Sequence, residues 1–146
     1  MAMELIIFVG LQAAGKSTWY FSNLAATHVH VSKDLMTNAR NRDARQRQMI
    51  EEALAGGRSV AVDNTNPTPA VRAPLIEIGR RYGARVIACF FEAVVKDAVA
   101  RNRLREGKAR VPDVAIYVTS RKLVPPTFEE GFDEVRVIAA LPDRTA

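Results

Sequence analysis

Five apolar residues, Leu5-Ile6-Ile7-Phe8-Val9, lead directly into Gly10-Leu11-Gln12-Ala13-Ala14-Gly15-Lys16-Ser17. The second stretch fits the pattern G-x-x-x-x-G-K-[ST] without a mismatch, between an apolar run and a helical segment. In this pattern the glycines let backbone N–H groups converge on phosphate oxygens, the lysine supplies a cation for the β- and γ-phosphates, and the serine hydroxyl suits Mg²⁺. The N-terminus of the following helix faces the same anion. We therefore predict a site for ATP or another nucleoside triphosphate, with Mg²⁺.

This loop supplies most of the predicted nucleotide contacts, which are Gly10, Leu11, Gln12, Ala13, Ala14, Gly15, Lys16, Ser17 and Thr18. Among them, Lys16 is predicted to be catalytic and Ser17 to be a metal ligand. A simpler interpretation is a glycine turn with an exposed lysine. The strand before the turn and the helix after it favour the phosphate site.

Four further apolar runs are typical of buried parallel strands, because they lack the strict alternation of a sheet with one solvated face. They cover residues 29–31, Ser59–Val62, 86–91 and 135–138. Helical patterning fills the segments between them, at residues 17–26, 34–55, 67–82, 95–105 and Asp113–Lys122. Pro74 lies inside the third segment, so we expect that helix to begin near Pro74 or to kink there. The alternation predicts an α/β fold with a doubly wound parallel sheet of the P-loop NTPase type, about five strands and helices on both faces.

The composition is that of an ordinary globular chain, because 48% of the residues are hydrophobic and 25% are charged. With 146 residues, we expect one domain over residues 1–146 and no phosphatase domain. The longest apolar run, residues 5–9, is far shorter than the roughly 20 residues of a membrane span. Glu4 stands where a secretion signal carries basic residues, so we expect a cytoplasmic protein without a membrane partner.

The net charge of +5 favours a polyanionic substrate, although a basic soluble protein has the same property, and charge alone does not decide. The single cysteine, Cys89, excludes a disulfide scaffold and is expected to be a small core residue. His28 and His30 alternate as strand residues do, so we expect no zinc site.

Polar residues follow two of the predicted strands, at the edge where ligands bind in a doubly wound sheet. Ser32-Lys33-Asp34 comes after the short strand at 29–31. Asp34 is placed to face the γ-phosphate and to accept the proton of an attacking hydroxyl. It also suits the N-cap of a helix, and spacing alone leaves both roles open.

Asp63-Asn64-Thr65-Asn66-Pro67 follows the strand at Ser59–Val62. An acidic residue here is where P-loop enzymes hold Mg²⁺, so Asp63 is a predicted metal ligand. Thr65 and Asn66 are predicted to bind substrate. The alternative is an Asx turn before the proline, but the strand end again points to the catalytic edge.

The basic run from Arg101 to Arg110 resembles a lid. Arg101 and Arg105 are four residues apart and would share one helix face, and Gly107 gives the following loop freedom. Such a lid brings guanidinium groups to the phosphates, and Arg105 is therefore a predicted catalytic residue. A solvated basic helix end, which the helix dipole favours, is the alternative.

Together these residues resemble the kinase domain of polynucleotide 5′-hydroxyl kinases, which heal nucleic-acid ends, over about residues 5–138. The matching segments are Ser17-Thr18-Trp19, Ser32-Lys33-Asp34, Asp63-Asn64-Thr65-Asn66-Pro67 with Arg72, Arg101-Asn102 with Arg105, and Pro125-Pro126-Thr127 followed by Glu130-Gly131-Phe132. The resemblance implies that Lys16 and Ser17 hold phosphate and metal. It also implies that Asp34 activates the 5′-hydroxyl and that Arg105 stabilises the transferring phosphoryl group.

The resemblance further implies that Arg101 and Val111 flank the adenine, and that Arg72 grips the substrate phosphate beside the reacting end. One departure is that residues 35–38 read Leu-Met-Thr-Asn where the phage member of this kinase family has an arginine, so Arg72 or Arg40 would have to serve. Another is that the chain has no Asp-x-Asp motif for a phosphatase. We expect a kinase only, or one part of a larger repair set.

The favoured function is therefore in-line transfer of the γ-phosphate of ATP–Mg²⁺ to the 5′-hydroxyl of DNA or RNA. A kinase for a sugar, antibiotic or nucleotide-sugar hydroxyl is the first alternative, because the fold does not fix the acceptor. A nucleotide-dependent regulatory module is the second, although it needs neither Asp34 nor Arg105. The oligomeric state, and any association with phosphatase or ligase proteins, stay open.

Overall fold

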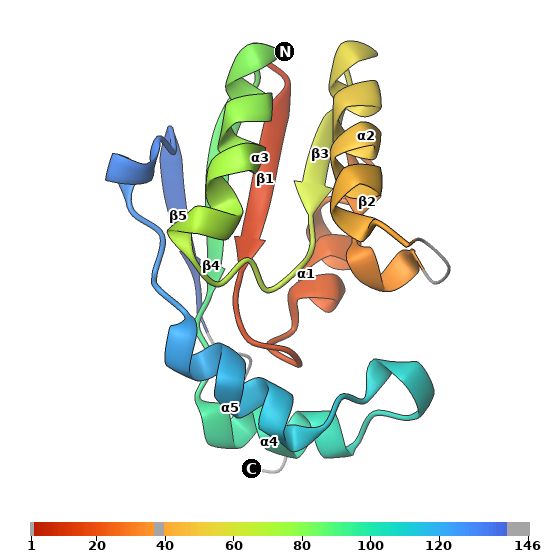
Figure 1. Ribbon diagram of the computed structural model, residues 1–146, viewed down its shortest axis with the longest axis vertical. Helices are drawn as coiled ribbons and strands as arrows, with labels where there is room; N and C mark the ends of the chain where they lie inside the picture. Colours follow the sequence, from red (N-terminus) through yellow and green to blue (C-terminus); the bar gives the residue numbers. More distant parts are fainter. Residues whose placement is uncertain (1, 37–39, 140–146) are drawn as a thin grey trace.

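The computed structural model describes residues 2–36 and 40–139. In these ranges, parallel strands form one five-stranded sheet in the order β2-β3-β1-β4-β5. The strands are β1 (Glu4–Val9), β2 (His28–Val31), β3 (Ser59–Val62), β4 (Arg85–Phe91) and β5 (Glu134–Ile138). The P-loop strand β1 lies at the centre, and all strands point their carboxyl ends the same way (Figure 1). The predicted doubly wound α/β fold is confirmed.

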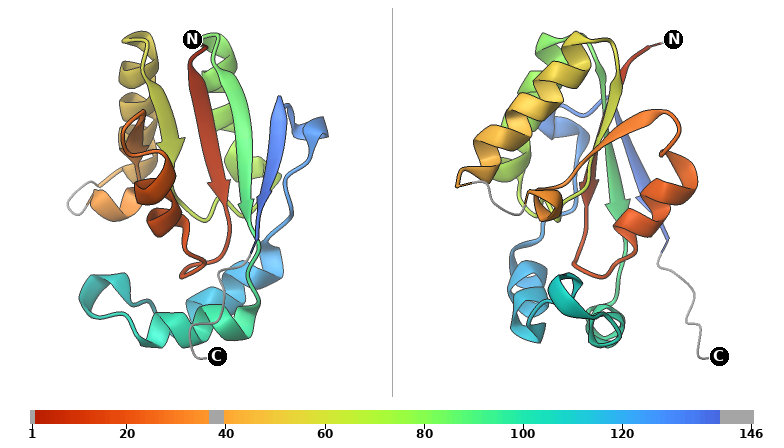
Figure 2. Two further views of the ribbon diagram at one scale, coloured as in Figure 1. Left: turned by 180° about the vertical axis from the view of Figure 1, so that it is seen from behind. Right: turned by 90° about the vertical axis from the view of Figure 1, so that its right-hand side faces the viewer.

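Helices cover both faces of this sheet and its carboxyl edge. They are α1 (Lys16–Asn23), α2 (Arg42–Ala55), α3 (Pro69–Arg81), α4 (Val95–Arg103) and α5 (Asp113–Lys122), with short 3-10 turns η1 (Lys33–Leu35), η2 (Gly107–Ala109) and η3 (Phe128–Glu130). Helices α2 and α3 lie on one face and α1 on the other (Figure 2). Helices α4 and α5 lie beyond the arrowheads of β1 and β4, which places the lid next to the P-loop (Figure 1).

Two hydrophobic clusters form the core, one on each face of the sheet, because successive strand side chains point to opposite faces. Leu5 and Ile7 of β1 belong to the cluster under α2 and α3, whereas Ile6 and Phe8 belong to the cluster under α1 and α4. Cys89 is fully buried in the second cluster, and burial raises the pKa of its thiol to about 12. In the described part of the chain, no helix is long and apolar enough to cross a membrane.

Helix α2 begins later than predicted. The prediction ran from residue 34, but the structure has the turn η1 there, and α2 begins at Arg42. Asn41 caps it, because its side-chain oxygen accepts a hydrogen bond from the backbone N–H of Ala44 at 3.1 Å. The intervening Thr37 and Asn38 belong to the segment at 37–39, which lies outside the described residues.

Two further helix boundaries differ from the sequence prediction. Helix α3 begins at Pro69, behind the cap residue Thr68, and continues through Pro74 to Arg81. Helix α4 ends at Arg103, so Arg105 lies beyond it and does not share a helix face with Arg101. The alternation of charge and apolar residues continues past position 103 and therefore hides this end.

Candidate active site

The loop between β1 and α1 has the backbone geometry of a phosphate cradle. Gly15 has φ 91° and Ala13 has φ 61°, both in the left-handed region where glycine is favoured. A Cβ on Gly10 would stand 3.0 Å from the Cβ of Phe91 and 3.2 Å from its carbonyl oxygen, so a side chain there would crowd β4. No described side chain caps the first N–H groups of α1, so they are available to bind an anion.

Lys16 folds back onto the loop. It is 8% exposed, and its Nζ donates hydrogen bonds to the carbonyl oxygens of Gly10 at 3.1 Å and Leu11 at 2.6 Å. The pKa of Lys16 is lowered to about 8, mainly by burial and also by the Arg105 charge, while Asp63 and Asp34 oppose the shift. Three predicted site residues therefore lie close enough to Lys16 for their charges to act on its ammonium.

Asp63 and Ser17 come together as the metal-site prediction requires. The Ser17 hydroxyl donates to Oδ2 of Asp63 at 2.6 Å, and Asp63 is 4% exposed at the end of β3. Burial alone would raise the pKa of Asp63, but hydrogen bonds from His30 and Ser17 and the Lys16 charge bring it below its ordinary value. Asp63 is thus held as an anion beside the phosphate cradle.

The Ser17 hydroxyl oxygen and the Asp63 carboxylate fit Mg²⁺, which binds one or two protein oxygens together with substrate phosphates. Among the described residues, no three His, Cys, Asp or Glu side chains gather as a metal cage, and Mg²⁺ in a kinase does not require one. Ser17 offers a hydroxyl oxygen and Asp63 a carboxylate at the N-terminus of α1.

Asp34 lies in η1, just beyond the carboxyl end of β2. Its side chain is exposed and makes no hydrogen bond or ion pair with any residue that the structure describes. Ser32, not Asp34, caps the turn, because its Oγ accepts from the N–H of Asp34 at 3.3 Å. The helix-cap interpretation of Asp34 is therefore wrong, and the carboxylate remains available to a ligand.

An asparagine that the sequence analysis did not single out holds this segment. The Oδ1 of Asn64 accepts from the backbone N–H of Lys33 at 2.9 Å, and its Nδ2 donates to Oε1 of Gln46 at 2.6 Å. Asn64 thus ties η1 to the loop after β3 and fixes the position of Asp34.

The lid is fastened at its base by Asn102, which is fully buried. Its Nδ2 donates to the carbonyl oxygen of Val111 at 2.6 Å, and its Oδ1 accepts from the Val111 N–H at 3.0 Å. Arg101 precedes this clasp at the end of α4, so the two predicted adenine neighbours, Arg101 and Val111, lie at one place. Arg105 is half-buried within the loop, and its Nη1 donates to the carbonyl oxygen of Ala109 at 3.3 Å.

Arg72 is not placed to bind a substrate strand. Its side chain is 0% exposed, and its Nε and Nη2 donate to the two carboxylate oxygens of Glu130 at 2.8 and 3.0 Å. Its Nη1 donates to the carbonyl oxygens of Asn66 at 3.0 Å and Val124 at 2.9 Å. The predicted contact with a substrate phosphate is therefore contradicted, because these protein groups occupy the guanidinium.

Asn66 is also internal, contrary to its predicted role in substrate binding. It is 3% exposed, with φ 40°, and its Nδ2 donates to the carbonyl oxygen of Phe8 at 2.8 Å. Asparagine tolerates this left-handed backbone, which turns the chain back beneath β1. Thr65 is half-buried, and its carbonyl oxygen accepts from the N–H of Gly10 at 3.0 Å, so it supports the P-loop through its backbone.

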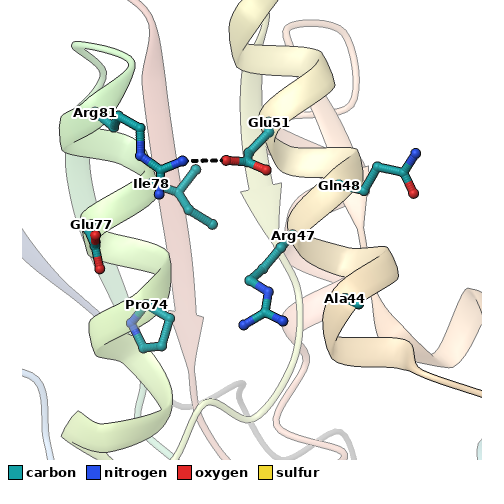
Figure 3. A pocket seen from close by; sticks show the side chains of 8 residues that line it. All are labelled: Ala44, Arg47, Gln48, Glu51, Pro74, Glu77, Ile78 and Arg81. Carbon is teal, nitrogen blue, oxygen red and sulfur yellow. Dashed lines mark hydrogen bonds and ion pairs between the residues drawn. The ribbon is translucent and has the colours of Figure 1, made fainter.

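A separate open groove of about 420 Å³ lies between α2 and α3 (Figure 3). An ion pair between Arg81 and Glu51, at 2.7 Å, bridges it, and Arg47 points into it. None of the predicted site residues lines this groove. It is distinct from the phosphate cradle.

Comparison with known proteins identifies relatives of the whole chain. A family model described as an AAA domain matches residues 5–125. The bifunctional polynucleotide phosphatase/kinase of Schizosaccharomyces pombe is 26% identical over 139 residues, which cover 92% of this chain and 33% of that protein. A relative from Acanthamoeba polyphaga mimivirus, whose name also pairs a polynucleotide phosphatase with a kinase, is 27% identical over 150 residues, or 97% of this chain and 34% of its own. The chain spans about a third of the length of these relatives.

Solved structures share the fold at lower identity. Chaetomium thermophilum Kti12 in complex with ADP-AlF3 superposes with a TM-score of 0.74 at 15% identity, over 97% of this chain and 92% of that one. A fungal RNA kinase superposes with a TM-score of 0.74 at 16% identity, over 100% of this chain and 40% of that one. A gluconokinase from Sinorhizobium meliloti superposes with a TM-score of 0.66 at 16% identity, over 96% of this chain and 84% of that one. The P-loop kinase fold, which implies nucleotide binding, and the resemblance to polynucleotide kinases are therefore confirmed.

Proposed function

Because the chain belongs to the AAA domain family and has a P-loop kinase fold, we propose that it transfers the γ-phosphate of ATP to the 5′-hydroxyl of a nucleic acid. One observation carries the proposal. The charges of the Asp34 carboxylate and the Arg105 guanidinium both influence the pKa of Lys16, the carboxylate raising it and the guanidinium lowering it, so a candidate proton acceptor and a second cation lie near the P-loop lysine. A carboxylate can take a proton from the acceptor, and two cations can hold the phosphates.

Lys16 and the N-terminus of α1 hold the triphosphate. The ammonium bonds to the carbonyl oxygens of Gly10 and Leu11. Phosphate oxygens are stronger acceptors, so the ammonium exchanges these carbonyl groups for the β- and γ-phosphates. Ser17 and Asp63 would hold Mg²⁺, which neutralises charge on the β- and γ-phosphate oxygens when bound.

Asp34 orients the acceptor and receives its proton. The acceptor oxygen forms a bond to the γ-phosphorus as the bond between that phosphorus and the β-phosphate oxygen breaks, and ADP leaves. The proton of the hydroxyl passes to the exposed carboxylate of Asp34. Arg105, in the lid, stabilises the charge that spreads over the transferring group.

The names of the two relatives support a nucleic-acid acceptor, because both join a polynucleotide phosphatase to a kinase. The net charge of +5 agrees with a polyanionic substrate. We propose 5′-hydroxyl ends of DNA or RNA as the acceptor, and a phosphatase that acts on the same ends as the functional partner.

A small-molecule hydroxyl is the second candidate acceptor. The burial of Arg72 favours it, because this burial removes the residue that we expected to recognise a phosphate beside the reacting end. The gluconokinase shares the fold, which shows that this scaffold also suits a small acceptor.

The experiment is transfer of radiolabelled γ-phosphate from ATP to 5′-hydroxyl DNA and RNA strands, with 5′-phosphorylated strands and gluconate as comparison acceptors. Label on the 5′-hydroxyl strands alone supports the proposal. Label on gluconate, with none on the strands, would replace it with the small-molecule kinase. Loss of label in Asp34→Asn ties the activity to this site.

A further inference from the structure

One oxygen of the Asp63 carboxylate accepts two hydrogen bonds. Ser17 Oγ donates to Oδ2 at 2.6 Å, and His30 Nε2 lies 2.8 Å from the same atom. No described residue donates to Oδ1. Because an ionised carboxylate only accepts, this geometry places a proton on Nε2 of His30.

Two aromatic rings of α1 pack against the imidazole of His30. Tyr20 stacks on it, with ring centroids 4.1 Å apart and an interplanar angle of 14°, and Phe21 meets it edge-on at 5.4 Å. The hydroxyl of Tyr20 donates to the carbonyl oxygen of His28 at 2.6 Å, which fastens the stacking ring to β2. The imidazole is 14% exposed and therefore has little freedom to turn.

The sheet sets the distance between His30 and Asp63. In the pairing of β2 with β3, His30 stands beside Ala61, and the N–H of Asp63 donates to the carbonyl oxygen of Val31 at 2.8 Å. The contact thus joins three elements. Helix α1 supplies Ser17 and the two aromatic rings, β2 supplies the imidazole, and the end of β3 supplies the carboxylate.

We propose that His30 is a positioning residue for the divalent cation of this site. The inference rests on the proposed function only in taking Ser17 and Asp63 as the cation's holders. A serine hydroxyl that ligates a cation through its oxygen must direct its proton elsewhere, and Oδ2 of Asp63 receives it here. By bonding to the same Oδ2, His30 holds the acceptor of the Ser17 proton in place and leaves Oδ1 without a donor among the described residues.

His28 provides a matched control within the same strand. It is the other histidine of the chain and also faces a carboxylate, with its Nε2 2.9 Å from Oε2 of Glu4. That pair lies at the amino end of β1, away from the cradle. Replacing His28 changes a histidine–carboxylate pair on β2 without changing Asp63.

The test measures Mn²⁺ binding to the full chain saturated with ADP, by electron paramagnetic resonance, in the parent, His30→Phe, His30→Gln, His30→Asn and His28→Phe. Phenylalanine retains the stacking ring but has no donor. The glutamine amide reaches the position of Nε2, whereas the asparagine amide is one methylene too short. Thermal unfolding identifies the variants that fold. The affinity for ADP, measured with a chelator that removes divalent cations, shows whether the phosphate cradle still binds nucleotide.

We expect His30→Phe and His30→Asn to weaken Mn²⁺ binding by about tenfold or more, the usual effect of losing a partner behind a metal ligand, and His30→Gln to stay within about threefold. The Mn²⁺ affinity of His28→Phe and the metal-free ADP affinity of all variants should not change.

Unchanged Mn²⁺ affinity in His30→Phe, or equal losses in the folded glutamine and asparagine variants, would overturn the assignment. If phenylalanine prevents folding, the glutamine–asparagine comparison decides. A chain that shows this Mn²⁺ pattern but labels no 5′-hydroxyl strand would refute the proposed function and leave the role of His30 intact.

Discussion

The guanidinium of Arg72 and the carboxylate of Glu130 meet through two parallel hydrogen bonds of 2.8 and 3.0 Å, with no part of Arg72 exposed. The pair joins α3 to η3, and its two residues are 58 positions apart in the sequence. Two backbone carbonyl groups accept the remaining bonds of Nη1. Glu130 also accepts from the N–H of Thr127 at 2.9 Å, so both partners are satisfied inside the protein.

Arg72→Ala should therefore act on stability. Removing one member of a buried ion pair leaves the other uncompensated, which costs about 3–5 kcal/mol of the free energy of unfolding. Urea unfolding measures this loss. Arg81→Ala is the control, since its pair with Glu51 is largely exposed and should contribute about 1 kcal/mol or less. Normal stability in Arg72→Ala, combined with weaker binding of strands, would restore the substrate role that its burial contradicts.

Asp34→Asn should reduce kcat about 100-fold or more, the usual contribution of a general base. ATP affinity should survive, because the Asp34 side chain makes no hydrogen bond or ion pair with a described residue of the cradle. Glu77→Gln, on α3 in the separate groove, is the matched change of charge and should leave kcat unchanged. Steady-state kinetics with strand and ATP varied separately make the comparison. Near-normal turnover in Asp34→Asn would show that another group receives the proton.

Arg105→Ala should lower kcat more than ATP affinity, because a lid arginine acts mainly on the transition state. Lys108→Ala removes an exposed cation from the same loop and serves as the control. Measured Kd for ATP and kcat for transfer separate the two effects. Equal weakening of ATP binding by both variants, with kcat unchanged, would make the lid a general electrostatic attractor.

ATP affinity should fall as pH rises above about 8, the lowered pKa of Lys16 in the free protein. Phosphates bind the protonated ammonium, so the affinity for ATP is highest at pH values where Lys16 of the free protein is already protonated. Above that pKa each pH unit costs up to about tenfold, because binding must also recover a proton. Calorimetric titrations from pH 7 to 9.5 test this, with Lys16→Met as the control, whose weaker binding should not change over the same range. A parallel slope in both proteins would assign the dependence to other groups.

The parts of the fold that local sequence determines were predictable. The P-loop is a contiguous pattern whose glycines the backbone requires, and apolar runs mark the strands of a sheet that is covered on both faces. Ser17 and Asp63 were each predicted as metal ligands, and their proximity agrees with the shared carboxyl edge of parallel strands.

What the sequence could not indicate depends on partners that are distant in the chain. The local sequence around Arg72 is the same whether its side chain faces solvent or pairs with Glu130. The role of His30 required the β2–β3 register, because its carboxylate partner lies 33 residues away. Asn64 and Asn102 lie in segments that resemble polynucleotide kinases, but the resemblance does not show that they bond to the backbone of Lys33 and Val111.

The clasp between Asn102 and Val111 separates the lid loop from the rest of the molecule. The side-chain amide of Asn102 holds both ends of the segment together, so the packing of the sheet does not depend on how many residues lie between them. Lengthening a flexible loop is inexpensive, at about 0.6 kcal/mol for each doubling. An insertion that keeps Arg105 in its place should therefore alter the predicted lid without disturbing the sheet or the phosphate cradle.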